Sequence, residues 1–151
     1  STCAAIRDLS ERFPELQFVL PVHPNPEVKR TVEELLCDLP GMHLIPPVDY
    51  LEFVHLMARA DLVLTDSGGV QEEAPSLGKP VLVLREVTER PEGVTAGTAR
   101  VVGTDRARIV AAATELLTSK AAYGRMANAV NPYGDGRASE RILSAITERL
   151  A

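Results

Sequence analysis

The chain has 151 residues, of which 45% are hydrophobic and 25% charged, a composition typical of a soluble globular protein with one buried core. The formal net charge of −5 and the absence of tryptophan argue against general nucleic-acid or anionic-membrane binding, whereas a single nucleotide needs only a few donors. No apolar run approaches a membrane span, no leader is evident, and Cys3 and Cys37 have no motif spacing, so we expect a cytoplasmic protein with reduced thiols.

Segments with helical spacing alternate with short apolar runs along the chain. Helices are predicted over Ser1–Arg12, from Pro26 through Leu36, over Tyr50–Ala60, from Gly69 to about Gly78, from Asp105 through Leu117 and around Ile142–Leu150. Strands are predicted over Gln17–Val22, Met42–Ile45, Leu62–Thr65, Val81–Leu84 and Ala99–Val102. Asp49 and Asp105 stand where N-caps are expected, Glu86–Thr95 is predicted to be a polar loop, and Asn131–Gly136 interrupts the chain before its last helix.

The strand segments are continuous apolar runs, which indicates a parallel sheet covered by helices on both faces. We therefore predict a doubly wound, Rossmann-like α/β fold, with residues 1–151 forming one domain because no linker or repeat divides them. In such open sheets, ligands bind beyond the C-terminal ends of the strands. Three loops follow predicted strands, and we expect all of them at one edge of the sheet: Val22–Pro26, Thr65–Gly69 and Arg85–Pro91.

The loop Ser67-Gly68-Gly69 has the properties of a phosphate site. Two glycines let the backbone approach a ligand and adopt positive φ, and the start of the next helix offers free N–H groups with a positive dipole end. Glu72 and Glu73 are placed in the first turn of that helix, where a carboxylate can accept hydrogen bonds from ribose hydroxyls. Taken alone, the segment is better explained as a tight strand-to-helix turn with dipole-complementing glutamates, and it lacks the Gly-Lys-[ST] element of a P-loop.

The other two loops carry His23, Arg85 and Arg90. A histidine can donate to a phosphate or protonate a leaving group near neutral pH, and an arginine pairs well with phosphate oxygens. In isolation, His23 reads as a surface histidine and the arginines as part of a surface ion-pair cluster with Glu86 and Glu89. The histidines and cysteines do not have metal-ligand spacing, so no metal or cofactor is expected.

Four runs taken together are far more specific than any single loop. They occur in this order: Val22–Pro26, Leu64–Pro80, Thr88–Glu92 and Asn131–Gly136. The series closely resembles the C-terminal domain of bacterial non-hydrolysing UDP-N-acetylglucosamine 2-epimerases, over essentially the whole chain. The resemblance implies a GT-B architecture, in which two Rossmann-like domains hold the UDP-sugar in the cleft between them.

The resemblance also implies roles for particular residues. Ser67, Gly68 and Gly69 would hold the diphosphate, and Glu73 the ribose hydroxyls. Phe53 would lie beside the uracil, and Arg90 would reach the nucleotide-sugar. His23 would contact the phosphates and assist the departure of UDP. From the residues alone, Phe53 would be a core residue of its helix.

The implied reaction interconverts UDP-N-acetylglucosamine and UDP-N-acetylmannosamine by elimination and re-addition of UDP. The carboxylates for that chemistry would belong to an N-terminal domain, which this chain lacks, and the parent protein would be a homodimer. A family member would also have a strand before Ser1, in the middle of the sheet. We therefore expect a fragment with two unpaired strand edges, marginally stable, inactive as an epimerase and able at most to bind UDP weakly.

Other functions are compatible with the same residues. A glycosyltransferase of the GT-B class shares the phosphate loop and the ribose-binding glutamate, and a hydrolysing epimerase would release free N-acetylmannosamine. The Asn131–Gly136 and Thr88–Glu92 runs favour the non-hydrolysing form. A non-catalytic nucleotide-binding module and a stable domain without function also remain open.

Overall fold

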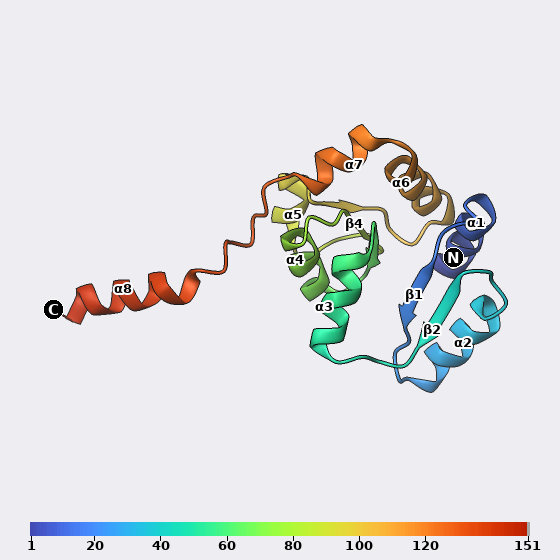
Figure 1. Cartoon of the computed structure of the whole chain (residues 1–151), viewed down its shortest axis with the longest axis horizontal. Helices are drawn as coiled ribbons and strands as arrows, with labels where there is room; N and C mark the ends of the chain where they lie inside the picture. Colours follow the sequence, from blue (N-terminus) through green and yellow to red (C-terminus); the bar gives the residue numbers. More distant parts are fainter. Residues whose placement is uncertain (151) are drawn as a thin grey trace.

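The computed structural model describes residues 1–150, in which helices and strands alternate (Figure 1). The helices are α1 (Thr2–Arg12), α2 (Pro26–Leu36), α3 (Tyr50–Arg59), α4 (Gly68–Ser76), α5 (Pro91–Ala96), α6 (Arg106–Thr118), α7 (Lys120–Ala127) and α8 (Ala138–Leu150). The strands are β1 (Phe18–Pro21), β2 (Met42–Ile45), β3 (Val63–Thr65), β4 (Val81–Val83) and β5 (Ala99–Val101). Every helix and strand predicted from the sequence is present.

Local capping explains where several helices begin. The Asp49 carboxylate accepts from the backbone N–H of Glu52 at 3.0 Å, and the Glu52 carboxylate accepts from the N–H of Asp49 at 3.3 Å, which forms a capping box at α3. The Asp105 side chain accepts from the N–H of Arg108 at 2.8 Å and begins α6 in the same way. The predicted N-caps are therefore confirmed.

Two short helices differ from the sequence-based prediction. The expectation of a polar loop over Glu86–Thr95 is wrong in its second half, because Pro91 occupies the first position of α5 and Gly97 ends that helix. Helix α7 was not predicted at all. Ser119 ends α6 and then caps α7 by accepting from the N–H of Ala122 at 3.2 Å. Both helices are too short to display a helical repeat of apolar residues.

All described strand pairs are parallel, as predicted, but they form two sheets rather than one. Strands β1 and β2 pair from Phe18 with Met42 to Pro21 with Ile45. The second sheet has the order β3-β4-β5, and β4 is the only described strand with a partner on each side. Within residues 1–150, β1, β2, β3 and β5 therefore each have one edge without a strand partner.

Strand β4 lies at the centre of the larger core. Leu82 belongs to an apolar cluster with residues of α1, α6 and α7, and Val81 and Val83 belong to another with Met57 of α3 and Ala74 of α4. These three strand residues are fully buried, and each such side chain contributes about 1.5–3 kcal/mol relative to exposure. The prediction of helices on both faces of a parallel sheet is confirmed for the sheet that contains β4.

Helix α8 lies away from the rest of the chain, at the end of an extended segment that follows α7 (Figure 1). Its apolar residues Ile142, Leu143 and Ile146 are 59%, 66% and 51% exposed. The periodicity of the sequence correctly predicts this helix, and these three side chains are not covered by another element among residues 1–150. No helix in the described part of the chain has the length and apolar character needed to cross a membrane.

Candidate nucleotide site

The N-terminus of α4 directly follows strand β3. Ser67 is its N-cap residue in extended backbone conformation, and the Thr65 hydroxyl accepts from the N–H of Ser67 at 3.0 Å. Within the described residues, the Ser67 side chain makes no capping hydrogen bond, so its hydroxyl can bind a ligand. The helix therefore presents its first N–H groups and its positive dipole end where the strand ends.

Two details of this loop differ from the sequence-based prediction. Gly68 and Gly69 do not adopt positive φ, because the helix begins at Gly68 itself and both glycines have helical backbone. For the same reason, Glu72 and Glu73 lie beyond the first turn, which contains no acidic residue. The missing Cβ atoms therefore serve close approach to the helix start and not a left-handed turn.

The polar groups predicted from the sequence gather around these two glycines. A Cβ atom on Gly68 would lie 3.7 Å from Nη2 of Arg90. A Cβ atom on Gly69 would lie 3.8 Å from Oε1 of Glu73 and 3.9 Å from Oγ of Ser67. The structure thus brings five of the seven predicted residues to one place, with a cation beside Gly68 and a carboxylate beside Gly69.

Arg90 is held in this place by several hydrogen bonds. Its Nε donates to the carboxylate of Glu72 on α4, its backbone N–H donates to the Thr88 hydroxyl at 2.9 Å, and its Nη1 donates to the Glu89 carbonyl at 3.1 Å. The hydrogen bond with Glu72 is the main reason that the pKa of Arg90 is raised above its ordinary value. The guanidinium group is therefore a fixed cation whose Nη2 faces the start of α4.

Tyrosine side chains that the sequence did not single out border the site. Tyr50 stands at the start of α3, and hydrogen bonding with the nearby Glu73 carboxylate raises the pKa of its phenol. The hydroxyl of Tyr133, from the loop before α8, accepts from the N–H of Gly93 at 3.1 Å and lies 3.5 Å from the Arg90 carbonyl. Tyr133 belongs to the Asn131–Gly136 run, whose physical use only the folded structure reveals.

Phe53 lies one turn after Tyr50 on α3, so the two side chains share a face of the helix. Phe53 is half-buried and packs against the cluster that contains Met57 and Ala74. It therefore has the core contact expected from the residue pattern and also remains partly exposed. Its contact with a uracil ring stays a prediction.

His23 lies in the loop after β1, in the other sheet. Its side chain is exposed, and its Nδ1 accepts from the backbone N–H of Asn25 at 3.1 Å. Among residues 1–150, no hydrogen bond or ion pair joins His23 to Ser67, Glu73 or Arg90. The expectation that all three loops share one edge is supported by contacts only for the loops after β3 and β4.

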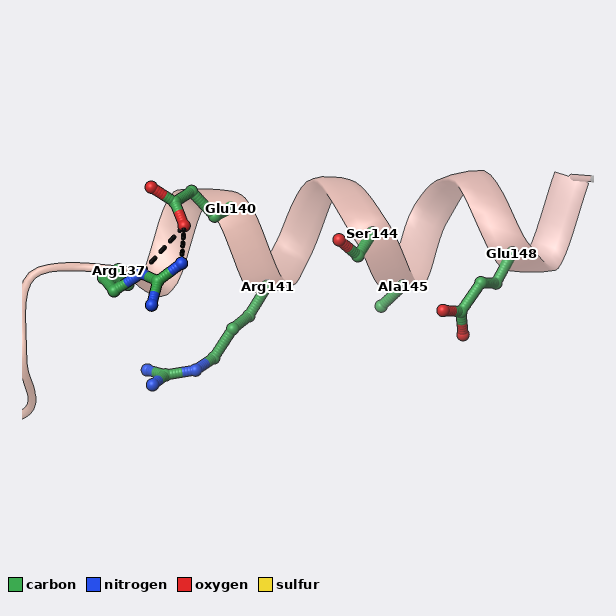
Figure 2. A pocket seen from close by; sticks show the side chains of 6 residues that line it. All are labelled: Arg137, Glu140, Arg141, Ser144, Ala145 and Glu148. Atoms are coloured by element: carbon green, nitrogen blue, oxygen red, sulfur yellow. Dashed lines mark hydrogen bonds and ion pairs between the residues drawn. The ribbon is translucent and has the colours of Figure 1, made fainter.

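Two hollows on the surface of residues 1–150 lie away from these residues. Figure 2 shows one that is lined by Arg137 and by residues of α8, with an ion pair between Arg137 and Glu140. A second hollow lies between α1 and α6, beside Asp8 and Arg106. A single exposed helix cannot enclose a ligand, and neither hollow contains a predicted site residue. No cluster of metal-binding side chains is found in the part of the chain described.

These features define the class of protein first. A parallel sheet covered on both faces, with a glycine-rich helix start and a carboxylate beyond a strand end, matches the Rossmann-like C-terminal half of a GT-B fold. The sequence profile of the family "UDP-N-acetylglucosamine 2-epimerase" matches residues 1–147. The chain therefore belongs to the UDP-N-acetylglucosamine 2-epimerase family.

Individual relatives show how much of the family protein is present. The UDP-N-acetylglucosamine 2-epimerase of Yersinia pestis is 55% identical over 144 residues, which are 95% of this chain and 38% of that protein. The UDP-GlcNAc 2-epimerase of Neisseria meningitidis bound to UDP-GlcNAc superposes with a TM-score of 0.92 at 46% identity, covering 97% of this chain and 40% of that one. For S. aureus MnaA with UDP, the TM-score is 0.93 at 46% identity, with 99% and 40% covered. The chain thus spans about two fifths of the length of its relatives.

Proposed function

We propose that this chain is the UDP-binding part of a non-hydrolysing UDP-N-acetylglucosamine 2-epimerase, which interconverts UDP-N-acetylglucosamine and UDP-N-acetylmannosamine. The observation that carries the proposal is the convergence of Ser67, Glu73 and Arg90 on Gly68 and Gly69 at the start of α4. Relatives of the same family hold UDP and UDP-GlcNAc in their solved structures, which supports a nucleotide as the ligand of this place.

In this proposal each group has a distinct role. The N–H groups at the start of α4 and the Ser67 hydroxyl bind the diphosphate, and Nη2 of Arg90 adds the positive charge. The Glu73 carboxylate accepts hydrogen bonds from the ribose hydroxyls in place of the Tyr50 phenol, while Phe53 on the same face of α3 borders the uracil. His23 contacts the phosphates and donates a proton to the departing UDP.

The sugar chemistry requires groups beyond those just named. Inversion at C2 needs carboxylates that remove and return the C2 proton on opposite faces of the sugar. No pair of carboxylates in residues 1–150 has an evident claim to this role. We therefore propose that these groups come from a second, N-terminal domain of the longer protein and that the sugar lies between the two domains. The resemblance also supports a homodimeric, cytoplasmic longer protein, which light scattering and cell fractionation test.

Calorimetric titration of the chain with UDP, UMP, ADP and UDP-N-acetylglucosamine tests the nucleotide site. We expect UDP and UDP-N-acetylglucosamine to bind alike, with UMP and ADP weaker, because the contacts involve the diphosphate and the uridine but not the sugar. Arg90→Ala is expected to weaken UDP about tenfold, as the loss of one charge-assisted contact predicts. Equal affinity for ADP and UDP, or no binding of UDP, would contradict the proposal.

A second experiment tests the reaction itself in the longer protein. Incubation with UDP-N-acetylglucosamine in the absence of any acceptor should yield UDP-N-acetylmannosamine with the nucleotide still attached, and this chain alone should yield none. Release of free N-acetylmannosamine would point to the hydrolysing form. A requirement for an acceptor would point to a glycosyltransferase.

A further inference from the structure

Gln71 is a buried polar residue inside α4, with only 1% of its surface exposed. A primary amide away from water is costly unless both of its ends are hydrogen-bonded. Both ends are satisfied here. The Nε2 of Gln71 donates to the carbonyl of Ser67 at 3.1 Å, and its Oε1 accepts from the Thr88 hydroxyl at 2.5 Å. Because the Ser67 carbonyl can only accept, it fixes which way the amide points.

These bonds form a continuous relay between two loops. The Thr88 hydroxyl that donates to Gln71 also accepts from the backbone N–H of Arg90 at 2.9 Å. The relay therefore runs from the carbonyl of Ser67, at the helix start, through Gln71 and Thr88 to the backbone of Arg90. It therefore joins Ser67, which is expected to bind the diphosphate, to Arg90, whose guanidinium group is expected to face the diphosphate.

Little else in residues 1–150 fixes this separation. The last backbone hydrogen bond between β3 and β4 runs from Leu84 to Thr65 at 2.9 Å, and no backbone hydrogen bond joins the loops beyond it. The other direct link is the ion pair of Arg90 with Glu72, whose side chains are 35% and 40% exposed. A bound diphosphate competes with Glu72 for the guanidinium group, whereas it cannot reach the buried amide of Gln71.

We propose that Gln71 is a positioning residue that, through Thr88, sets the distance between the helix start at Ser67 and the guanidinium of Arg90. The inference rests on the proposed UDP site and adds the residues that set the distance between Ser67 and Arg90 across it. With the relay intact, Arg90 faces the terminal phosphate of a nucleoside diphosphate. Without it, the loop that carries Arg90 moves independently of α4, and the terminal phosphate loses its cation. Binding of the uridine and the first phosphate does not depend on the relay.

The test compares UDP with UMP, each titrated into the chain and its variants. Gln71→Met keeps the volume and removes both hydrogen bonds, and Thr88→Val does the same from the other side of the relay. We expect either change to weaken UDP about tenfold, the worth of a bond to a charged group, and to leave UMP within about twofold. Thr88→Ser retains the hydroxyl and should bind UDP with the affinity of the parent chain, unlike Thr88→Val. Val87→Ala, on the exposed neighbour of Thr88, is the control and should bind UDP as the parent chain does.

Amide hydrogen exchange provides a readout that does not need a nucleotide. In Gln71→Met and Thr88→Val, the N–H of Arg90 should lose protection while those of Val81 and Val83 in the core keep theirs, which separates a local release of the loop from unfolding. If the parent chain does not bind UDP, the proposed function fails, and exchange at Arg90 still decides on the relay. Unchanged protection of Arg90, or equal losses of UDP and UMP affinity, would overturn the inference.

Discussion

The charges around Gly68 and Gly69 are unusual for a phosphate site, because carboxylates outnumber cations. Glu73 lies beside Gly69, and Glu72 already holds the Nε of Arg90. A diphosphate here depends on the N–H groups of the helix start and on the Nη2 of Arg90, since no excess of positive charge is present. The carboxylate of Glu73 is useful only toward a ligand that donates hydrogen bonds, such as a ribose with two vicinal hydroxyls.

Replacement of Glu73 by glutamine tests this division of roles. Glu73→Gln keeps the size of the side chain but removes the charge that strengthens a hydrogen bond from a hydroxyl. We expect UDP affinity to fall about tenfold, by roughly 1.5 kcal/mol, in a calorimetric titration. The affinity of 2′-deoxy-UDP should fall much less, because that ligand has already lost one of the donors. Equal losses for both nucleotides would place Glu73 away from the ribose.

At the residue scale, the sequence points to side chains whose chemistry suits a ligand, but not to the residues that hold those side chains in place. Ser67, Glu73 and Arg90 offer a hydroxyl, a carboxylate and a cation after strand ends, but it is the family resemblance that assigns them their roles. Gln71 and Thr88 are not found, because nothing in a sequence distinguishes a buried glutamine from an exposed one within a helix. Tyr133 lies 40 residues from its partner Gly93, a contact that no local pattern predicts.

Turns determine where helices and strands begin. The turn at Gly41, before β2, leaves no room for a side chain. Its φ of 72° is left-handed, and a Cβ atom would overlap the backbone carbonyl oxygen of Leu16, which precedes β1. Gly97 after α5 has a similar φ of 83°, but a Cβ atom there would meet nothing within 4 Å. Both glycines have a left-handed backbone conformation, and they differ only in the space available for a Cβ atom.

This difference predicts unequal costs for the same substitution. Gly97→Ala should lower the free energy of unfolding by about 1 kcal/mol, the cost of placing an ordinary residue in the left-handed region. Gly41→Ala should cost at least twice as much, since either the strand pair β1–β2 or the Leu16 backbone must also shift. Urea denaturation of both variants measures the two costs. Equal costs would show that the chain around Leu16 yields without penalty.

Element boundaries and strand order were predicted unequally well. Long amphipathic segments such as α1 and α6 are correct because their apolar spacing extends over several turns. The helix α5 is only six residues long, and only Pro91 marks its beginning. The division into two sheets depends on which strands are neighbours in space, so the apolar runs could predict parallel strands but not the separation of β1–β2 from β3–β4–β5.

At the scale of the whole molecule, an ion pair joins α1, near the N-terminus, to the start of α6. Asp8 accepts from Nε and Nη2 of Arg106 at 2.6 and 2.5 Å, and this pairing is the main reason that the pKa of Asp8 is lowered. A carboxyl group whose pKa is lower in the folded state than in the unfolded state stabilises the fold above its unfolded pKa, near pH 4. That stabilisation is lost as the pH falls through the folded value.

Asp8→Asn should therefore lower the melting temperature at pH 7, and its difference from the parent chain should shrink only as the pH falls through the lowered pKa of Asp8. Thermal unfolding followed by circular dichroism between pH 7 and pH 3 measures both effects. Glu148→Gln on α8 is the matched control and should follow the parent chain at every pH. If the melting temperatures of Asp8→Asn and the parent chain differed by the same amount at every pH, the ion pair would contribute nothing to acid sensitivity.

Helix α8 tests which part of the chain forms the cooperative unit. Ile142, Leu143 and Ile146 are exposed, whereas Leu116 of α6 is buried in the cluster around Leu82. Deletion of residues 138–151 should leave the melting temperature within about 2 °C of the parent chain, because few contacts are lost. Leu116→Ala should instead cost about 2–5 kcal/mol, as cavities in packed cores do. The deletion should also reduce self-association in light scattering, since an apolar helix face is removed. A deletion that destabilises as much as Leu116→Ala would mean that α8 packs against the body of the chain in solution.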